Sequence, residues 1–266
     1  MNNKWLVVLS LIFLLQNTRT NAQTPYSIGV VDSVYSKELN EWRTLNIYLP
    51  NGYSADSAAN FSVVYLLDGS ADEDFLHISG LVSFYNFPWL DVMKPTIVVG
   101  VANVDRKRDF CFPTSIAQDK IDFPTAGGSA AFRNFLEKEL VPFIEKKYSN
   151  NPDRMLIGQS LGGLLACEVL AKQPQLFSKY LIVSPSLWWD NESLLLPLNA
   201  SSIPHSTKVY IAVGKDEPTI MKKDAKKLAS LLKKKKISTQ IEIIADEDHA
   251  GVLHTAAQRG FRMLGK

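Results

Sequence analysis

The sequence has few cysteines, little net charge and no long apolar run beyond its first fifteen residues. Two cysteines in 266 residues exclude a disulfide framework and a cysteine-rich zinc module. The 29 lysines and arginines are nearly matched by 27 acidic residues, so the chain lacks the basic excess of nucleic-acid-binding proteins and we expect no nucleic acid partner. There is no glycine-rich phosphate loop and no metal-ligand spacing of histidines and carboxylates, so we expect no cofactor and no metal.

The N-terminus has the pattern of a secretory signal. Met1–Lys4 is short and positive, Trp5–Leu15 is an apolar run broken only by a serine, and Thr20–Ala22 places small residues at the −3 and −1 positions of a cleavage site. The apolar run is too short to cross a bilayer as a helix, although an uncleaved anchor is the alternative. We therefore expect residues 1–22 to be a signal peptide and residues 23–266 to be one neutral domain, exported to the periplasm or the medium without a stable membrane anchor.

Strand and helix patterns alternate along the remaining chain. We predict strands over Leu45–Leu49, Ser62–Leu67, Thr96–Val101, Arg154–Ile157, Tyr180–Val183, Lys208–Val213 and Ile241–Ile244. We predict helices over Ser129–Lys147 (kinked at Pro142), Leu161–Lys172, Ala225–Lys235 and Gly251–Leu264, and a long loop over Arg106–Thr125. This alternation, in a chain that is 46% hydrophobic, predicts a single α/β domain with a doubly wound, mostly parallel sheet.

The segment Gly158–Gly163, with the sequence GQSLGG, lies between a predicted strand and a predicted helix. G-x-S-x-G in this context is typical of the nucleophile elbow of α/β-hydrolases, so we predict Ser160 as a nucleophile. Glycine is needed on both sides because the strained turn brings the flanking chains too close for side chains. The turn also places the Leu161 N–H at a helix N-terminus, where it can stabilise an oxyanion. A glycine-rich turn without chemistry is the alternative.

A serine hydroxyl needs a base, and the chain has four histidines. In the α/β-hydrolase fold the catalytic histidine comes last, on the loop after the final strand. His249 lies between the predicted strand Ile241–Ile244 and the last helix, so we predict it as the base, ahead of His254, His205 and His77.

The acid of such a triad follows a strand between the serine and the histidine. The strand Lys208–Val213 is followed by Gly214, Lys215 and two neighbouring acids, Asp216 and Glu217. Hydrolases of this class place the acid three residues after such a glycine, which favours Glu217, and Asp216 is the alternative.

Two further segments are expected at the same edge of the sheet. After the strand Ser62–Leu67, Gly69 lets the backbone approach an acyl oxygen, and we predict the Ser70 N–H as the second oxyanion donor. Trp188 and Trp189 follow another predicted strand, so we predict that they line a pocket for substrate, with loop packing as the alternative.

Several of these segments also resemble a known family. Arg43–Pro50, Tyr65–Gly69, Arg108-Asp109 followed by Pro113-Thr114, and Ser184–Trp189 resemble segments of the putative-esterase family of α/β-hydrolases. That family holds enterochelin-type siderophore esterases, feruloyl and acetylxylan esterases, and mycolyltransferases. Asp-Gly at 68–69, where the polysaccharide esterases more often have His-Gly, favours the siderophore-esterase-like branch.

The residues and the resemblance together imply an exported serine esterase that hydrolyses carboxylic esters through Ser160, His249 and Glu217 and an acyl-enzyme. The substrate class implied first is a siderophore-type or other small-molecule ester. A glycan-linked or feruloyl ester, and acyl transfer by the same triad, are alternatives, and a non-catalytic binding protein on a hydrolase scaffold is another. The sequence carries no prediction of oligomeric state.

Overall fold

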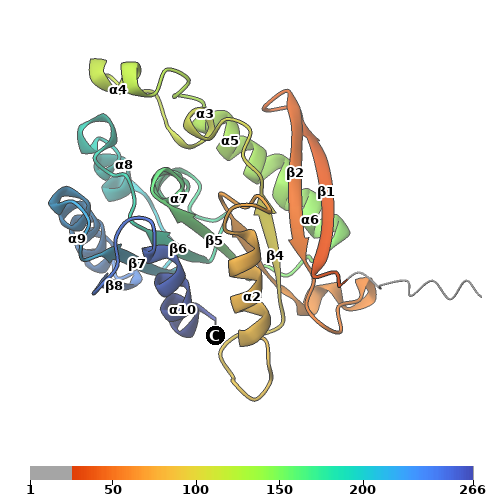
Figure 1. Ribbon diagram of the computed structural model, residues 1–266. Helices are drawn as coiled ribbons and strands as arrows, with labels where there is room; N and C mark the ends of the chain where they lie inside the picture. The colour runs from red at the N-terminus through yellow and green to blue at the C-terminus, as the bar shows by residue number, and fades with distance from the viewer. Residues whose placement is uncertain (1–25, 266) are drawn as a thin grey trace, which may run out of the picture.

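One mixed sheet runs through the centre of the molecule, in the order β1-β2-β4-β3-β5-β6-β7-β8 (Figure 1). The computed structural model describes residues 26–265, so the predicted signal peptide lies outside the described residues. The strands are β1 (Gly29–Ser36), β2 (Glu41–Tyr48), β3 (Ser62–Leu66), β4 (Thr96–Val101), β5 (Arg154–Gln159), β6 (Lys179–Val183), β7 (Lys208–Gly214) and β8 (Ser238–Ile244). β1 and β2 pair antiparallel and β2 pairs antiparallel with β4, whereas the six strands β3 to β8 all run parallel to one another.

Helices cover both faces of the sheet. One face carries α2 (Phe75–Tyr85) and α10 (Val252–Leu264), which lie side by side in Figure 1. The opposite face carries α5 (Ser129–Phe135), η2 (Leu136–Leu140), α6 (Val141–Lys147), α7 (Leu161–Lys172) and α9 (Thr219–Lys234). Shorter pieces lie in the connections: η1 (Ala55–Asn60), α3 (Arg106–Phe110), α4 (Ala117–Asp122), η3 (Trp189–Glu192) and α8 (Leu195–Ala200). Among residues 26–265, no helix is long and apolar enough to cross a membrane.

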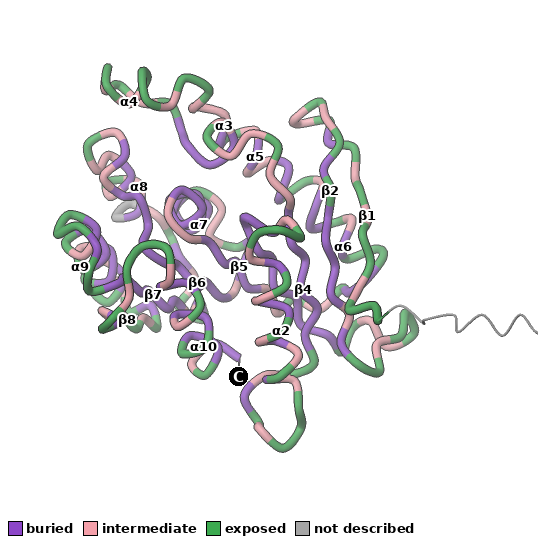
Figure 2. Tube along the Cα trace, in the orientation of Figure 1, coloured by how far each residue is buried: buried purple, intermediate pink, exposed green. Residues whose placement is uncertain are grey.

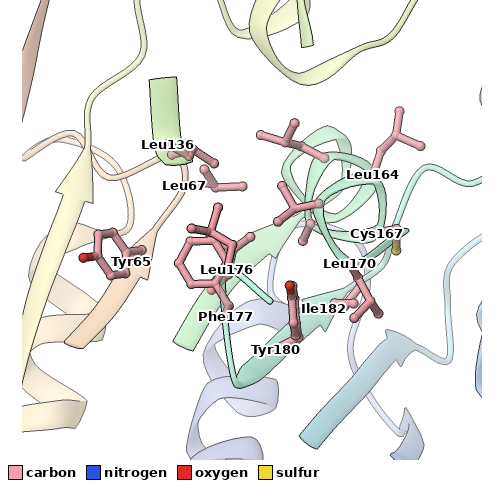
Figure 3. Close-up of a cluster of buried hydrophobic side chains, with 14 of the residues drawn as sticks. Tyr65, Leu67, Leu136, Leu164, Cys167, Leu170, Leu176, Phe177, Tyr180 and Ile182 are labelled. Atoms are coloured by element: carbon pink, nitrogen blue, oxygen red, sulfur yellow. The ribbon is translucent and has the colours of Figure 1, made fainter. Parts of the chain in front are cut away.

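Two hydrophobic cores form because successive side chains of each strand point to opposite faces. In β3, Val63 and Tyr65 join the core under α5, α6 and α7, while Val64 and Leu66 join the core under α2 and α10. Figure 3 shows Tyr65 in the first core with side chains from α7, β6 and their connection. The central strands and α7 are buried on all sides, and exposed residues lie on the outer helices and edges (Figure 2). The predicted fold class is confirmed.

The structure differs from the sequence prediction in several places. The helix α2 was not predicted, and α9 begins at Thr219 rather than at Ala225. β1 was not predicted, because as an edge strand it has exposed residues on both faces and no clear apolar alternation. The predicted loop 106–125 contains the short helices α3 and α4. The predicted helix 129–147 is interrupted by a π-helical turn, η2, directly before Pro142, where a wider turn accommodates a residue that has no N–H and a bulky ring.

Candidate active site

A cleft of about 430 Å³ opens at the carboxyl ends of the parallel strands. Ligands bind at this edge in open α/β folds because the strand-to-helix loops meet there. The cleft is lined by Asp68, Glu73, Asp74, Arg106, Gln159, Ser160, His249 and Ala250. A larger hollow of about 740 Å³ lies along α9, but its lining is mainly lysine. The smaller cleft is the candidate active site, because Ser160 and His249, the predicted nucleophile and base, both line it.

Ser160 lies at the turn between β5 and α7, with φ of 58° and ψ of −119°. A non-glycine residue in this region costs about 1–3 kcal/mol, and such strain persists only where the surrounding structure enforces it. The Ser160 N–H donates to the Val183 carbonyl of β6 at 3.0 Å, which fixes the turn to the sheet. A Cβ on Gly158 would clash with the carbonyl of Gly162, so glycine is required there, as the elbow motif predicts.

His249, on the loop after β8, and Glu217, on the loop after β7, are in direct contact. His249 Nδ1 lies 2.8 Å from Glu217 Oε2, and Glu217 is only 4% exposed. Burial would raise the pKa of Glu217, but hydrogen bonds from His249, Ser184 and the Gly214 N–H outweigh it and lower the pKa. An ionised carboxylate only accepts hydrogen bonds, so Nδ1–H is the donor and Nε2 is left free to take a proton.

The loops carrying these two residues are held against each other by backbone contacts. The Asp216 N–H donates to the Glu247 carbonyl at 3.1 Å, and a Cβ on Gly214 would clash with that same carbonyl. Glycine at 214 therefore permits the close approach that brings His249 to Glu217. The side chain of Asp216 is exposed, and the residue that the structure brings to His249 is Glu217.

The other histidines lie elsewhere. His77 on α2 and His254 on α10 contact each other edge to face, with ring centroids 4.1 Å apart. Burial, and then the nearby His254, lower the pKa of His77. His205 precedes β7 and so lies at the amino ends of the strands, the edge opposite the cleft. Of the four, His249 lines the cleft with Ser160.

The predicted oxyanion donors differ in what they contact. Leu161 is the first residue of α7, where N–H groups have no partner within the helix. The Ser70 N–H instead donates to the carboxylate of Glu73, at 3.2 Å from Oε2. Ser70 follows Gly69, whose N–H donates to the Val101 carbonyl at 3.0 Å and whose carbonyl accepts from Asn46 at 2.8 Å.

Arg106 connects this loop to the elbow, a role that the sequence analysis missed. Its Nε and Nη2 donate to Asp68 at 2.6 and 2.9 Å, and Nη2 also donates to the Gln159 carbonyl at 3.2 Å. Asn103 adds a hydrogen bond to Asp68 at 2.7 Å. Their position in the sequence could have indicated this role, because Asn103 and Arg106 lie shortly after the end of β4, the neighbour of β3 in the sheet.

The tryptophan loop after β6 presents different residues from those predicted. Trp189 is 0% exposed and donates from Nε1 to the Phe112 carbonyl at 2.9 Å. Trp188 is partly buried beside Phe123, with ring centroids 6.3 Å apart. The structure thus places both indoles in loop packing, outside the lining of the Ser160 cleft.

Two serines of the same loop contact the site instead. Ser184 donates to Glu217, and Ser186 Oγ lies 3.5 Å from Ser160 Oγ. Neither serine is predicted to have a role from the sequence patterns alone. Their place at the end of β6, the strand between β5 and β7 in the sheet, was the available signal.

Among the described residues, no group of three or more His, Cys, Asp or Glu side chains is arranged to hold a metal ion. The candidate site comprises a strained serine after β5, a buried carboxylate after β7 and a histidine after β8. Fold and geometry together define an α/β-hydrolase.

Comparison with known proteins gives the family. The family model described as Putative esterase matches residues 36–261, and the chain belongs to this family. Ferri-bacillibactin esterase BesA of Bacillus subtilis is 31% identical over an aligned length of 195 residues, and the match covers 66% of this chain and 66% of that protein. The chain thus spans about two thirds of the length of this curated relative.

Two solved structures share the fold at higher coverage. The BES protein from Bacillus cereus has a TM-score of 0.80 and 27% identity, over 94% of this chain and 100% of that one. An IroE-like serine hydrolase from Shewanella oneidensis has a TM-score of 0.80 and 29% identity, over 89% of this chain and 80% of that one. The resemblance seen in the sequence is confirmed, and the protein is an ester hydrolase.

Proposed function

We propose that the protein is a serine esterase in which Ser160, His249 and Glu217 act as nucleophile, base and acid. The observation that carries the proposal is the 2.8 Å contact between His249 Nδ1 and the buried, ionised Glu217, beside a serine held in a strained turn of the same cleft. Glu217 fixes the tautomer and orientation of the imidazole and stabilises the imidazolium that forms during the reaction.

The reaction proceeds in two halves. His249 Nε2 takes the proton of Ser160 as Oγ attacks the ester carbonyl, and the imidazolium then protonates the leaving alcohol. This leaves an acyl-enzyme on Ser160. Water activated by the same nitrogen attacks the acyl carbon, and the proton returns to Ser160 when the acid is released.

Negative charge develops on the carbonyl oxygen in both halves. The Leu161 N–H at the start of α7 is one donor for this oxygen, where the helix dipole also favours negative charge. The Ser70 N–H is the second donor. Removing one such donor from other enzymes lowers kcat by about 10²–10³-fold. We therefore count both N–H groups as part of the catalytic machinery.

We assign the substrate to the class of siderophore-type carboxylic esters. The support is the set of names carried by relatives: a ferri-bacillibactin esterase, and a siderophore enterobactin esterase of Emericella nidulans that is 39% identical over 72 residues. Those 72 residues are 26% of this chain and 24% of that protein. A siderophore trilactone and simple short-chain esters are the substrates to compare.

Export is part of the proposal, and it rests on the charged, apolar and small-residue pattern of residues 1–22. The chain is expected in the periplasm or the medium with Gln23 as its first residue. N-terminal sequencing of protein recovered from those fractions tests this location. Intact protein that is retained in the cytoplasm would contradict it.

The central test is Ser160→Ala. We expect hydrolysis of a siderophore trilactone and of short-chain esters to fall by roughly 10⁴-fold or more, with unchanged thermal unfolding. Labelling by a fluorophosphonate should also disappear. Ser230→Ala, an exposed serine of α9, is the matched control and should keep both. Activity retained by purified Ser160→Ala would overturn the assignment.

A further inference from the structure

Glu73 contacts a donor that the reaction is expected to use. Its Oε2 accepts the Ser70 N–H at 3.2 Å, and its backbone N–H donates to the Ser70 carbonyl at 3.1 Å. Asn103 Nδ2 donates to the same carboxylate, at 3.1 Å from Oε1 and 3.2 Å from Oε2. A carboxylate oxygen thus lies on the Ser70 N–H, where an ester oxygen is expected to bind.

The two partners of this contact differ in their freedom. Ser70 follows Gly69, which is fixed through both its backbone groups to β4 and β2. Glu73 is exposed, in the turn that precedes α2. A substrate carbonyl can therefore reach the donor by displacing the Glu73 side chain, whereas the Ser70 backbone stays in place.

From this geometry we infer that Glu73 is a specificity-determining residue that occupies the Ser70 oxyanion donor until a substrate displaces it. The inference rests on the proposed function, because it takes Ser70 N–H as an oxyanion donor. Each substrate must replace a hydrogen bond to a carboxylate with one to a neutral carbonyl, which lowers the fraction of enzyme that is ready to react. Glu73 therefore reduces kcat/KM for every ester.

The charge of Glu73 adds selectivity among esters. The neighbouring guanidinium of Arg106 is already engaged by both oxygens of Asp68, so the hydrogen bonds on Glu73 come from the neutral Asn103 and the Ser70 backbone. The cleft lining also includes the carboxylate of Asp74. When it is displaced, Glu73 remains near the acyl group, so an anionic acyl group is repelled more than a neutral one of the same size.

The experiment compares Glu73→Ala, Glu73→Gln and Asp72→Asn. Asp72 is an exposed carboxylate next in sequence, so its substitution removes the same charge from the same turn without touching Ser70. The substrates are 4-nitrophenyl butyrate and 4-nitrophenyl hemisuccinate, which are of similar size and differ in the charge of the acyl group. Binding of phenylboronic acid, whose anionic tetrahedral adduct on Ser160 uses the oxyanion donors, is measured separately.

We expect Glu73→Ala to raise kcat/KM for the butyrate by about threefold to tenfold, since one hydrogen bond no longer has to be displaced. The gain for the hemisuccinate should be about twofold larger still, because the repulsion is also removed. The boronate should bind tighter by the same factor as the butyrate gain. Glu73→Gln keeps a hydrogen-bond acceptor without the charge, so its kcat/KM should lie between those of wild type and Glu73→Ala. Asp72→Asn should have the kcat/KM of wild type.

An unchanged or lower kcat/KM in Glu73→Ala and Glu73→Gln would overturn the inference, as would equal gains from Asp72→Asn. These results are separable from failure of the proposed function. If Ser160→Ala were as active as wild type, the triad assignment would fail. If Ser160→Ala is inactive and Glu73→Ala shows no gain in either hydrolysis or boronate binding, only the role of Glu73 fails.

Discussion

The two sides of the cleft are assembled in opposite ways. On the histidine side, formed by the ends of β6, β7 and β8, Glu217 receives hydrogen bonds from His249, Ser184 and the Gly214 N–H. On the oxyanion side, formed by the ends of β3 and β4, the Ser70 N–H is occupied by Glu73. In the proposed mechanism the first set of contacts orients the base, while the second has to open before an ester binds. The histidine side can therefore be arranged for reaction while the Ser70 N–H on the oxyanion side is still occupied.

The contrast has a physical origin in where the residues lie. Glu217 and His249 lie on loops that are clamped together by backbone hydrogen bonds and by the close approach at Gly214. Glu73 lies in an exposed turn, and its carboxylate is free to exchange partners with water. Backbone-fixed contacts survive substrate entry, whereas exposed side-chain contacts are replaced at little cost.

The largest expected effect comes from breaking the histidine side. His249→Ala should lower kcat by about as much as Ser160→Ala, roughly 10⁴-fold or more, because nucleophile and base act as a unit. His254→Ala and His205→Ala are the controls. They should cost little, because His254 packs against His77 and His205 lies at the opposite edge of the sheet. An inactive His254→Ala would show that the base lies on α10 and not on the loop before it.

A smaller effect is expected from weakening the same side without removing its base. Glu217→Gln should lower kcat by roughly 10²–10⁴, because the histidine still acts when it is poorly oriented. Asp216→Asn, the matched exposed neighbour, should lower it by less than about tenfold. The reverse ranking would move the acid to Asp216. Mild effects of both would indicate a Ser–His dyad in which neighbouring carboxylates share the acid's part.

The histidine side was also the part that sequence patterns could predict. The elbow glycines and the position of His249 after the last strand are properties of the backbone path, which motif spacing encodes directly. The choice of Glu217 over Asp216 came from its spacing after Gly214, and Glu217 is the acid that contacts His249. The inner strands β3 to β7 were found because burial on both faces produces apolar runs. The edge strand β8 is more exposed, and only its last part, Ile241–Ile244, was predicted.

The oxyanion side could not be predicted to the same depth. The contacts of Glu73, in an exposed turn, and of Arg106, at the start of α3, depend on side-chain conformations for which the sequence has no periodic signal. Trp189 illustrates the same limit, because its position after β6 suggested a pocket wall, whereas its indole fills the core beneath the loop. β1 escaped prediction because an exposed edge strand is selected by pairing with β2 and not by burial.

An intermediate effect should follow from loosening the oxyanion side. Arg106→Ala leaves Asp68, which is 8% exposed, with Asn103 as its remaining side-chain donor, and removes the link to the Gln159 carbonyl. We expect a loss of about tenfold in kcat/KM from misplacement of the donor loop. The free energy of unfolding should fall by about 1–3 kcal/mol, because a buried carboxylate loses its charged partner. Urea unfolding and ester kinetics measure the two effects.

Lys107→Ala is the control for Arg106→Ala, because its ammonium donates to the Asp122 carbonyl, away from Asp68. It should keep wild-type kinetics. If Arg106→Ala were also indistinguishable from wild type, the link between the two loops would have no part in holding the donor, and the oxyanion side would be ordered by its backbone alone.

The smallest effect concerns how the acid contributes to stability as pH changes. Burial acts to raise the pKa of Glu217, yet hydrogen bonds from His249, Ser184 and Gly214 lower it below the ordinary value of 4.5. The unfolded chain therefore takes up the proton first as pH falls, so stability from this carboxylate is present above pH 4.5 and is lost as pH drops through the lower folded value.

Glu217→Gln removes the titration. The difference in unfolding free energy between wild type and Glu217→Gln should thus be constant above pH 4.5 and shrink below it. Urea unfolding of both proteins across this range gives the difference directly. A difference that grew on acidification would mean that the folded protein holds Glu217 protonated, and the His249 contact could then not orient a neutral imidazole as the mechanism requires.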